Sequence, residues 1–512
     1  MMKKRVVIIG AGPAGLTAAY ELTKHPEYAV TVLEADDMAG GISRTVNANG
    51  NRMDLGGHRF FSKDERVMKW WFSIFAKQGK PSLDDKLLGR KSPLAPGGPD
   101  PETQDDVFLV RKRISRIYYK HTFFDYPLSL SAKTLHNLGF FTLMQAGFSY
   151  LGACIHKRPE TSLENFYINR FGKKLYSMFF EGYTEKLWGR HPRDISADWG
   201  AQRVKGLSVV AVLKDLAQRV LHTKPRQKET SLIEEFYYPK YGPGQLWTAV
   251  ADKMKALGGE VRYNSPVTGI LRQGSHITGV ICNGQEIPAD IFISSMPLKD
   301  LVEGLADVPH EVRHIAGHLP YRDFVTVGLL VDKLALNNNT KIPTFNNNIP
   351  DCWIYVQDGN VKMGRIQVFN NWSPYMVKKV QNTVWVGLEY FCAEGDFFWN
   401  LPEEECIKLA ARELAQIGVI TSDTPILASH RERVKKAYPA YFDTYREIKI
   451  LTDYLNQFDN LYCVGRNGQH RYNNMDHSMV TAFEAVHNIV SGRTDKTNIW
   501  NVNTEKEYHE TK

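Results

Sequence analysis

Residues 5–34 read RVVIIGAGPAGLTAAYELTKHPEYAVTVLE, and this stretch decides the fold. The short apolar run at 5–9 has the pattern of a strand that is buried on both faces. The stretch at 16–24 reads as a helix, and a second apolar run follows at 29–33. Two buried strands joined by a helix form a βαβ unit of a parallel sheet.

The turn between the first strand and the helix carries three glycines in the spacing GxGxxG. The first glycine permits a tight turn, the second lets the backbone approach a pyrophosphate, and the third allows the helix to pack on the strand. An acidic residue at the end of the second strand can accept hydrogen bonds from a ribose. The pattern therefore predicts a dinucleotide site formed by Gly10, Gly12, Pro13, Ala14, Gly15 and Glu34.

Length and composition limit the possible classes of protein. The chain has 512 residues, 43% of them hydrophobic and 23% charged, with a formal net charge of +8. At about 150 residues per domain this predicts about three folding units, and it excludes a fibre, a disordered chain and a small disulfide scaffold. The positive charge is spread along the chain, which favours an anionic small ligand over nucleic acid.

None of the six cysteines lies within three residues of another, so no metal site is predicted and the thiols are expected to be reduced and buried. Residues 137–155 carry no charge, but polar side chains and three glycines dilute the segment, which is typical of a buried domain helix. The apolar run at 6–9 is too short for a signal peptide. We therefore expect a cytoplasmic protein without membrane contact. The sequence leaves the oligomeric state open, and an oligomer is compatible with it.

Three further segments contain glycine: MAGGISR at 38–44, DLGGH at 54–58 and NLYCVGR at 460–466. Glycine lets the backbone pass close to a bulky ligand. Together these segments resemble the FAD-binding domain shared by amine oxidases, protoporphyrinogen oxidases, phytoene desaturases and UDP-galactopyranose mutases. The resemblance favours FAD over NAD, and it adds these residues to the expected cofactor site: Gly41, Ser43, Arg44, Gly57, His58, Gly465, Arg466 and Met475.

The resemblance implies an α/β fold in which a discontinuous Rossmann-like FAD-binding domain carries a helical insertion domain and an antiparallel β-sheet domain. Leucine and aromatic stripes predict helices in the first insertion, and short alternating apolar runs predict strands in the second. We assign residues 1–90, 235–318 and 456–495 to the FAD-binding domain, 125–232 to the helical domain, 91–124 and 319–455 to the β-sheet substrate-binding domain, and 496–512 to a C-terminal tail.

A more specific resemblance lies in other segments. EGYTEKLWGR at 181–190 is similar to a segment of bacterial UDP-galactopyranose mutases, and YPKYGPGQLW at 238–247 resembles the mutases' proline–glycine segment. FNNWSPY at 369–375 resembles the eukaryotic branch. The resemblance implies that Arg203 and Arg365 hold the diphosphate of a UDP-sugar, which suits arginine because its planar fork binds two phosphate oxygens. It also places His58 at the flavin ring. Read alone, each of these three residues favours a structural role.

The same resemblance implies contacts with the base, the sugar and the phosphates for Tyr183, Trp188, Tyr355, Trp372, Tyr438, Tyr472 and Asn474. Read alone, each aromatic residue could equally be part of the core. Trp372 stands where the eukaryotic pattern has tyrosine, so a hydroxyl is lost. Asn474 stands on an aspartate of the bacterial motif, and this loss of a carboxylate leaves the identity of the sugar open.

The activity implied by the resemblance is a redox-neutral pyranose/furanose ring contraction of a UDP-sugar for cell-surface polysaccharide biosynthesis. N5 of reduced FAD would be the nucleophile at the anomeric carbon, and NAD(P)H is a candidate reductant. One alternative is an FAD-dependent oxidoreductase of the amine oxidase or protoporphyrinogen oxidase type, which does not explain the segment at 181–190 or the arginine pair. A non-catalytic flavoprotein that binds a nucleotide sugar is the other.

Overall fold

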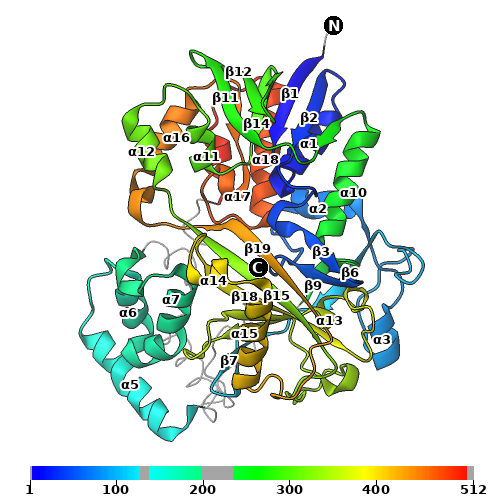
Figure 1. The fold of residues 1–512 in the computed structure, drawn as a ribbon, viewed down its shortest axis with the longest axis vertical. Coiled ribbons are helices and arrows are strands. Elements are labelled where there is room, and N and C mark those ends of the chain that lie inside the picture. The colour runs from blue at the N-terminus through cyan, green and yellow to red at the C-terminus, as the bar shows by residue number, and fades with distance from the viewer. Residues whose placement is uncertain (1–2, 127–137, 198–234, 504–512) are drawn as a thin grey trace, which may run out of the picture.

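The computed structural model describes residues 3–126, 138–197 and 235–503. Its upper half in Figure 1 contains a parallel sheet, and its lower half contains a larger, mostly antiparallel sheet. A group of helices, α5 to α7, lies at one side of the lower half. The α/β prediction with a discontinuous first domain is confirmed.

The parallel sheet has the strand order β10-β2-β1-β14-β20. Its strands come from distant parts of the chain, yet all four pairings are parallel. The two strands expected from residues 5–34 lie at its centre as β1 and β2, with Val6 opposite Val30. The strand bounds are β1 (Lys4–Ile9), β2 (Tyr28–Leu33), β10 (Glu260–Arg262), β14 (Ile291–Ser294) and β20 (Leu461–Cys463).

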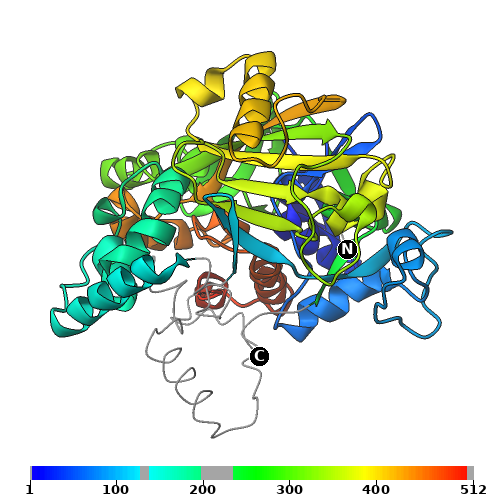
Figure 2. The ribbon, with the colours of Figure 1, turned by 90° about the horizontal axis from the view of Figure 1, so that it is seen from below.

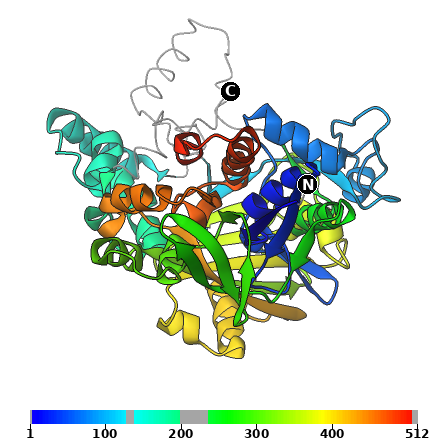
Figure 3. The same ribbon diagram turned by 90° about the horizontal axis from the view of Figure 1, so that it is seen from above.

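Both faces of this sheet are covered, as its apolar strands require. Helices α1 (Pro13–Thr23), α10 (Pro243–Ala256) and α18 (Met475–Ser491) cover one face, and Figure 3 shows α1 and α18 side by side there. The other face packs against a three-stranded antiparallel sheet and two short helices. These are β11 (Val267–Gln273), β12 (His276–Cys282), β13 (Gln285–Pro288), α11 (Leu298–Glu303) and α12 (His310–Gly317).

The second large sheet has the order β19-β15-β18-β17-β16-β7-β8, and only the β16–β7 pairing is parallel. Helix α15 (Glu403–Gln416) covers its outer face, at the top of Figure 2. The strand bounds are β7 (Ser115–Tyr119), β8 (Thr122–Asp125), β15 (Tyr321–Val331), β16 (Trp353–Val356), β17 (Arg365–Val368), β18 (Val384–Cys392) and β19 (Ala428–Pro439).

Some segments lie elsewhere than the sequence suggested. Strand β6 (Val107–Lys112) pairs with β5 (Ala76–Lys77) and β9 (Glu235–Pro239) in a separate small sheet rather than with the seven-stranded one. Part of the expected tail is folded: α19 (Thr497–Trp500) follows Lys496, whose buried ammonium donates to the Leu461 carbonyl at 2.7 Å. Five of the six free cysteines are buried as expected, but Cys154 is exposed.

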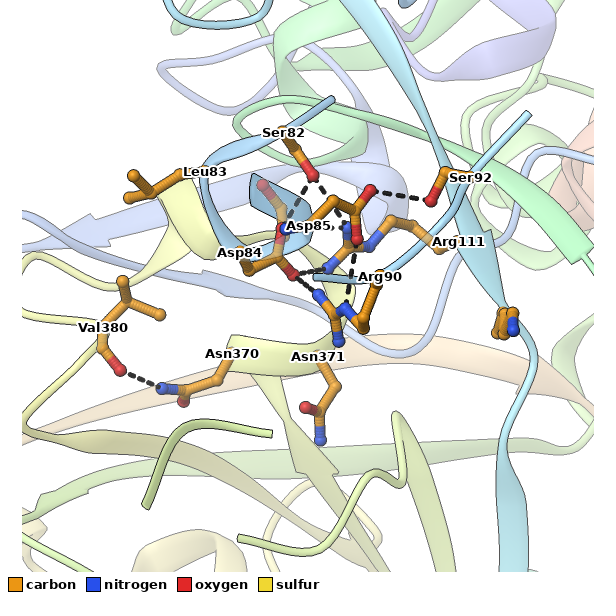
Figure 4. A network of polar contacts seen from close by, with 12 residues as sticks. Ser82, Leu83, Asp84, Asp85, Arg90, Ser92, Arg111, Asn370, Asn371 and Val380 are labelled. Atoms are coloured by element: carbon orange, nitrogen blue, oxygen red, sulfur yellow. Dashed lines mark hydrogen bonds and ion pairs between the residues drawn. The ribbon is translucent and has the colours of Figure 1, made fainter. Parts of the chain in front are cut away.

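A buried polar network fixes α3 (Leu83–Leu88) against β6 (Figure 4). The Asp84 carboxylate accepts from Ser82 at 2.7 Å and forms ion pairs with Arg90 and Arg111. Although burial opposes its charge, the two guanidinium groups lower the pKa of Asp84 to about 2. The network therefore keeps a charged carboxylate inside the protein, where each removed partner would leave an uncompensated charge.

Candidate functional site

The first glycine loop has the backbone geometry that its sequence predicts. Gly10 follows β1 with φ +98°, and Gly12 caps α1. A Cβ on Gly15 would lie 1.9 Å from the Gly10 carbonyl oxygen, so only glycine lets α1 approach the strand this closely. A Cβ on Gly41, in the second glycine segment, would lie 3.3 Å from the Gly12 Cα atom. The two loops therefore touch, and together they form a backbone cradle.

Glu34 closes β2 beside this cradle. Its carboxylate accepts the backbone N–H of Ala11 at 2.5 Å and that of Asp36 at 2.9 Å. Burial raises the pKa of Glu34, while these two hydrogen bonds favour the charged form. Arg44 forms an ion pair with the Asp36 side chain at the same edge.

The cradle opens into a large cavity of about 880 Å³, lined by the glycine loops of the parallel sheet and by strands of the seven-stranded sheet. It is lined by residues from near both ends of the chain and from the middle. Most of the predicted site residues line it: Gly10, Gly12, Pro13, Ala14, Glu34, Gly41, Ser43, Arg44, Gly57, His58, Tyr355, Arg365, Tyr438, Gly465, Arg466, Tyr472, Asn474 and Met475.

Arg365 is held by three side chains in the cavity wall. Its Nε donates to the Tyr183 hydroxyl at 2.7 Å, and its Nη1 donates to the Tyr438 hydroxyl at 3.0 Å and to Glu389 at 3.1 Å. Burial opposes the charge, but Tyr183, Tyr438 and Glu389 raise the pKa of Arg365 above its ordinary value. The guanidinium is therefore charged and fixed in orientation at the cavity wall.

Aromatic rings surround this arginine. Tyr438 stacks on Tyr472 with ring centroids 5.6 Å apart, and the Arg466 guanidinium lies 4.7 Å from the Tyr472 ring centre. Tyr355 packs against Tyr126, with ring centroids 4.5 Å apart, and both residues line the cavity. Burial raises the pKa of Tyr438, so its phenol stays protonated and can donate a hydrogen bond to an anion.

His58 stands on the loop that follows β4 (Asn51–Asp54). Its Nδ1 lies 3.0 Å from the Gly56 carbonyl oxygen, which assigns the ring proton to Nδ1 and leaves Nε2 as an acceptor. Burial and the charge of Arg466 lower the pKa of His58 to about 4, so the imidazole is neutral at physiological pH. A Cβ on Gly57 would lie 2.2 Å from the Trp353 ring, which explains the glycine before this histidine.

Asn474 is the N-cap of α18 and lines the cavity beside Met475. Asparagine and aspartate are both preferred N-cap residues because each accepts hydrogen bonds from the first turn. The departure from the bacterial aspartate is therefore compatible with the helix. It does change the charge at this point of the cavity wall.

The segment at 181–190 acts mostly behind the cavity. Tyr183, on α7 (Gly182–Trp188), reaches Arg365 but does not itself line the cavity. Lys186 donates to the carbonyls of Asp358 and Met363, the latter at 3.3 Å, in the loop that leads to Arg365. Burial lowers the pKa of Lys186 to about 8. The segment thus positions the arginine.

Besides Tyr183, two further predicted substrate contacts lie away from the cavity. Trp372 is fully buried, and its indole N–H donates to the Cys352 carbonyl at 2.8 Å while its ring packs 5.3 Å from Tyr238. Trp188 is 2% exposed and packs against Phe442. Both are core residues because apolar neighbours enclose their rings. Gly15 also lies outside the lining, and Arg203 lies outside the described residues.

The cavity lining includes basic side chains that were not predicted from the sequence. Only Arg59, which directly follows His58, stood beside a recognised motif. Arg113 follows the last residue of β6, and Arg433 and Lys435 lie within β19, where no local signal marks them. The lining holds seven basic side chains against the acidic Glu34, Asp36, Asp300 and Asp476, so it favours an anionic ligand. The basic residues are Arg44, Arg59, Arg113, Arg365, Arg433, Lys435 and Arg466.

Comparisons of sequence relate the chain to flavoproteins. The family described as flavin containing amine oxidoreductase matches residues 13–447. A phytoene desaturase (neurosporene-forming) of Rhodobacter capsulatus is 26% identical over 57% of this chain and 52% of that protein. Protoporphyrinogen oxidase 2 of Arabidopsis thaliana is 44% identical over 12% of each chain. The chain thus spans about half the length of the first of these relatives and far less of the second.

Solved structures share the fold at low sequence identity. A reduced UDP-galactopyranose mutase has a TM-score of 0.75 at 19% identity, covering 99% of this chain and 98% of that one. A putrescine oxidase bound to putrescine has a TM-score of 0.56 at 14% identity, covering 96% and 99%. Within residues 3–126, 138–197 and 235–503, we find no helix with the length and apolar character of a bilayer span.

The cradle fits FAD. Its glycines leave room for a pyrophosphate beside the N-terminus of α1, and Glu34 sits at the ribose position. The prediction of FAD as the cofactor is confirmed by the family match and by the flavoprotein fold. With more than four fifths of its length matched, this chain belongs to the flavin containing amine oxidoreductase family.

Proposed function

We propose that this flavoprotein catalyses a redox-neutral pyranose/furanose ring contraction of a UDP-sugar. The observation that carries the proposal is the charged, oriented Arg365 held by two phenols and a carboxylate in the wall of a cationic cavity. Such a wall suits a diphosphate, which must be bound, released and recaptured during the reaction. The shared fold with a mutase over nearly the whole chain agrees with it.

The residues would act as follows. Arg365 binds the diphosphate and stabilises its charge when the anomeric carbon–oxygen bond breaks, and the Tyr438 and Tyr472 hydroxyls add hydrogen bonds. Arg203 is proposed as the second diphosphate ligand. Bound FAD in its reduced form supplies the nucleophile for the anomeric carbon. His58 is neutral, so it presents an acceptor and no extra positive charge toward the flavin site.

The proposal also includes a reductant, a class of sugar and a cellular location. A nicotinamide nucleotide is the proposed reductant that first reduces the flavin. We name only the class of substrate, a UDP-sugar, because Asn474 stands where the bacterial motif has an aspartate at the expected sugar site. We place the reaction in the cytoplasm, in the supply of precursors for cell-surface polysaccharides.

The second candidate is an FAD-dependent oxidoreductase. Its support is that the sequence relatives are desaturases and oxidases. Such an enzyme would transfer electrons from its substrate to the flavin and then to an acceptor. An oxidoreductase of this type gives no reason for the seven basic side chains that line the cavity.

The deciding experiment uses the purified FAD-loaded protein, with and without dithionite reduction. UDP-galactopyranose and other UDP-sugars are supplied, and the products are separated by anion-exchange chromatography. We expect furanose product from at least one sugar, only after reduction and without net flavin oxidation. Formation of peroxide or reduced flavin in proportion to product would contradict the mutase and support the oxidoreductase. Binding of UDP-sugars without product would support a non-catalytic binding protein.

A further inference from the structure

Helix α5 (Phe140–Ile155) exposes an unusual amount of apolar surface. Six large apolar side chains on this one helix are between 46% and 81% exposed, whereas the other exposed large apolar residues are scattered over several elements. The sequence predicted a buried helix here, and on this face the prediction is wrong. The six residues are Phe140, Phe141, Met144, Phe148, Leu151 and Ile155.

These side chains form one continuous stripe. At about 100° per residue, all six fall within about 100° of arc around the helix axis. The opposite side carries Ala146 and Ala153, which are buried against α6 (Leu163–Tyr176). The stripe therefore points away from the protein, and Figures 1 and 2 place α5 at the outer edge of the molecule.

Cations flank the stripe. Helix α5 contains no charged residue, and the exposed residues Lys157 and Arg158 follow closely after its last turn. The exposed Lys173 lies on the adjacent helix, where the backbone N–H of Lys174 donates to the Ser149 hydroxyl at 3.0 Å. A phenylalanine-rich stripe with a cationic border is the pattern of a helix that lies in a membrane interface.

We propose that α5 lies flat on an anionic lipid surface, with its stripe among the acyl chains and the flanking cations at the phosphate groups. The contact is interfacial, so no spanning helix is needed. A second copy of the chain fits less well. The α5 helix of a second copy offers no acidic side chain to the flanking cations, whereas an anionic lipid surface supplies phosphate groups to them. Each cation near such a surface strengthens binding by roughly fivefold.

The test is flotation of the FAD-loaded full-length protein with vesicles. Vesicles of phosphatidylcholine with phosphatidylglycerol are compared with vesicles of phosphatidylcholine alone. Phe141→Ser/Phe148→Ser should reduce the vesicle-bound partition at least roughly a hundredfold, as expected for two phenylalanine side chains that no longer leave water. Phe397→Ser is the matched control, because that phenylalanine is 70% exposed on a different helix, α14 (Phe397–Asn400).

Lys157→Gln/Arg158→Gln should weaken binding to the anionic vesicles roughly 25-fold and leave binding to the neutral ones unchanged. Unchanged unfolding midpoints and flavin spectra show that both pairs of variants are folded. The proposal is overturned if the wild-type protein stays unbound to anionic vesicles, or if Phe141→Ser/Phe148→Ser floats like it. If the wild-type protein did not bind vesicles, and if it were a dimer that Phe141→Ser/Phe148→Ser converted to a monomer, the stripe would instead be a dimer interface.

Discussion

Arg365 pairs with a buried carboxylate and is proposed to bind a diphosphate. One pair of substitutions can separate its effect on stability from its effect on ligand binding. Arg365→Met keeps most of the side-chain volume but leaves Glu389, which is fully buried, without its ion partner. Breaking a buried ion pair in this way costs about 3–5 kcal/mol in the free energy of unfolding. Glu389→Gln in the same chain removes the stranded charge and keeps a partner in Gln367. We therefore expect the double variant to recover most of the lost stability.

Ligand binding should not recover with stability. Loss of the charged hydrogen bonds from Arg365 to a diphosphate is worth about 1.5–3 kcal/mol, or roughly 10- to 100-fold in the dissociation constant of UDP. Calorimetric titration with UDP and denaturant unfolding at saturating FAD measure the two effects. Arg190→Gln, at an exposed arginine paired with Asp443, is the control. If Arg365→Met/Glu389→Gln bound UDP like the wild type, the diphosphate role of Arg365 would be refuted.

Four further predictions concern other parts of the chain. Gly15→Ala forces a methyl group onto a backbone oxygen 1.9 Å away, which should cost about 1–3 kcal/mol and release flavin on gel filtration. Lys186→Met frees the loop before the arginine and should raise the KM for the UDP-sugar roughly tenfold or more without loss of flavin absorbance. Arg111→Met removes one ion partner of the buried Asp84 and should lower the free energy of unfolding by about 3 kcal/mol. Burial lowers the pKa of His470 to about 4 from 6.5, so its contribution to stability is complete above pH 6.5 and falls by about 3 kcal/mol as the pH drops to 4, a slope that His470→Asn should flatten.

Each prediction has an outcome that contradicts it. Flavin retention by Gly15→Ala equal to that of Gly317→Ala, which meets open space, would remove the packing argument for the third glycine. A lower kcat with an unchanged KM in Lys186→Met would argue against positioning of the diphosphate site. A wild-type unfolding midpoint for Arg111→Met, or an unaltered pH slope for His470→Asn, would show that burial costs less there than the structure implies.

The parallel sheet and the glycine loop were predictable because their rules are local. Positive φ at Gly10 and close packing at Gly15 follow from steric constraints within a few residues. Apolar periodicity likewise marks β1 and β2 without reference to the rest of the chain. The cofactor and the fold class therefore follow from short stretches of sequence.

Motif position could not separate cavity residues from core residues. Trp372 and Tyr438 were both predicted as substrate contacts, but Trp372 is enclosed by aromatic rings while Tyr438 lines the cavity. Composition had the same limit for α5, where a segment that reads as core turned its largest side chains outward. Burial depends on what packs against a residue, and that partner is absent from the local sequence.

The amino-acid sequence by itself determined a βαβ unit, an FAD cradle and a set of candidate arginines and tyrosines. The tertiary structure decided which of them meet. Arg365 reaches Tyr183 and Tyr438 across 182 and 73 residues of chain. Steric rules on φ and side-chain periodicity act over a few residues, whereas charge, hydrogen bonding and burial depend on distance in space. For this reason the FAD cradle could be predicted from the local sequence, whereas the full set of basic side chains that line the cavity could not.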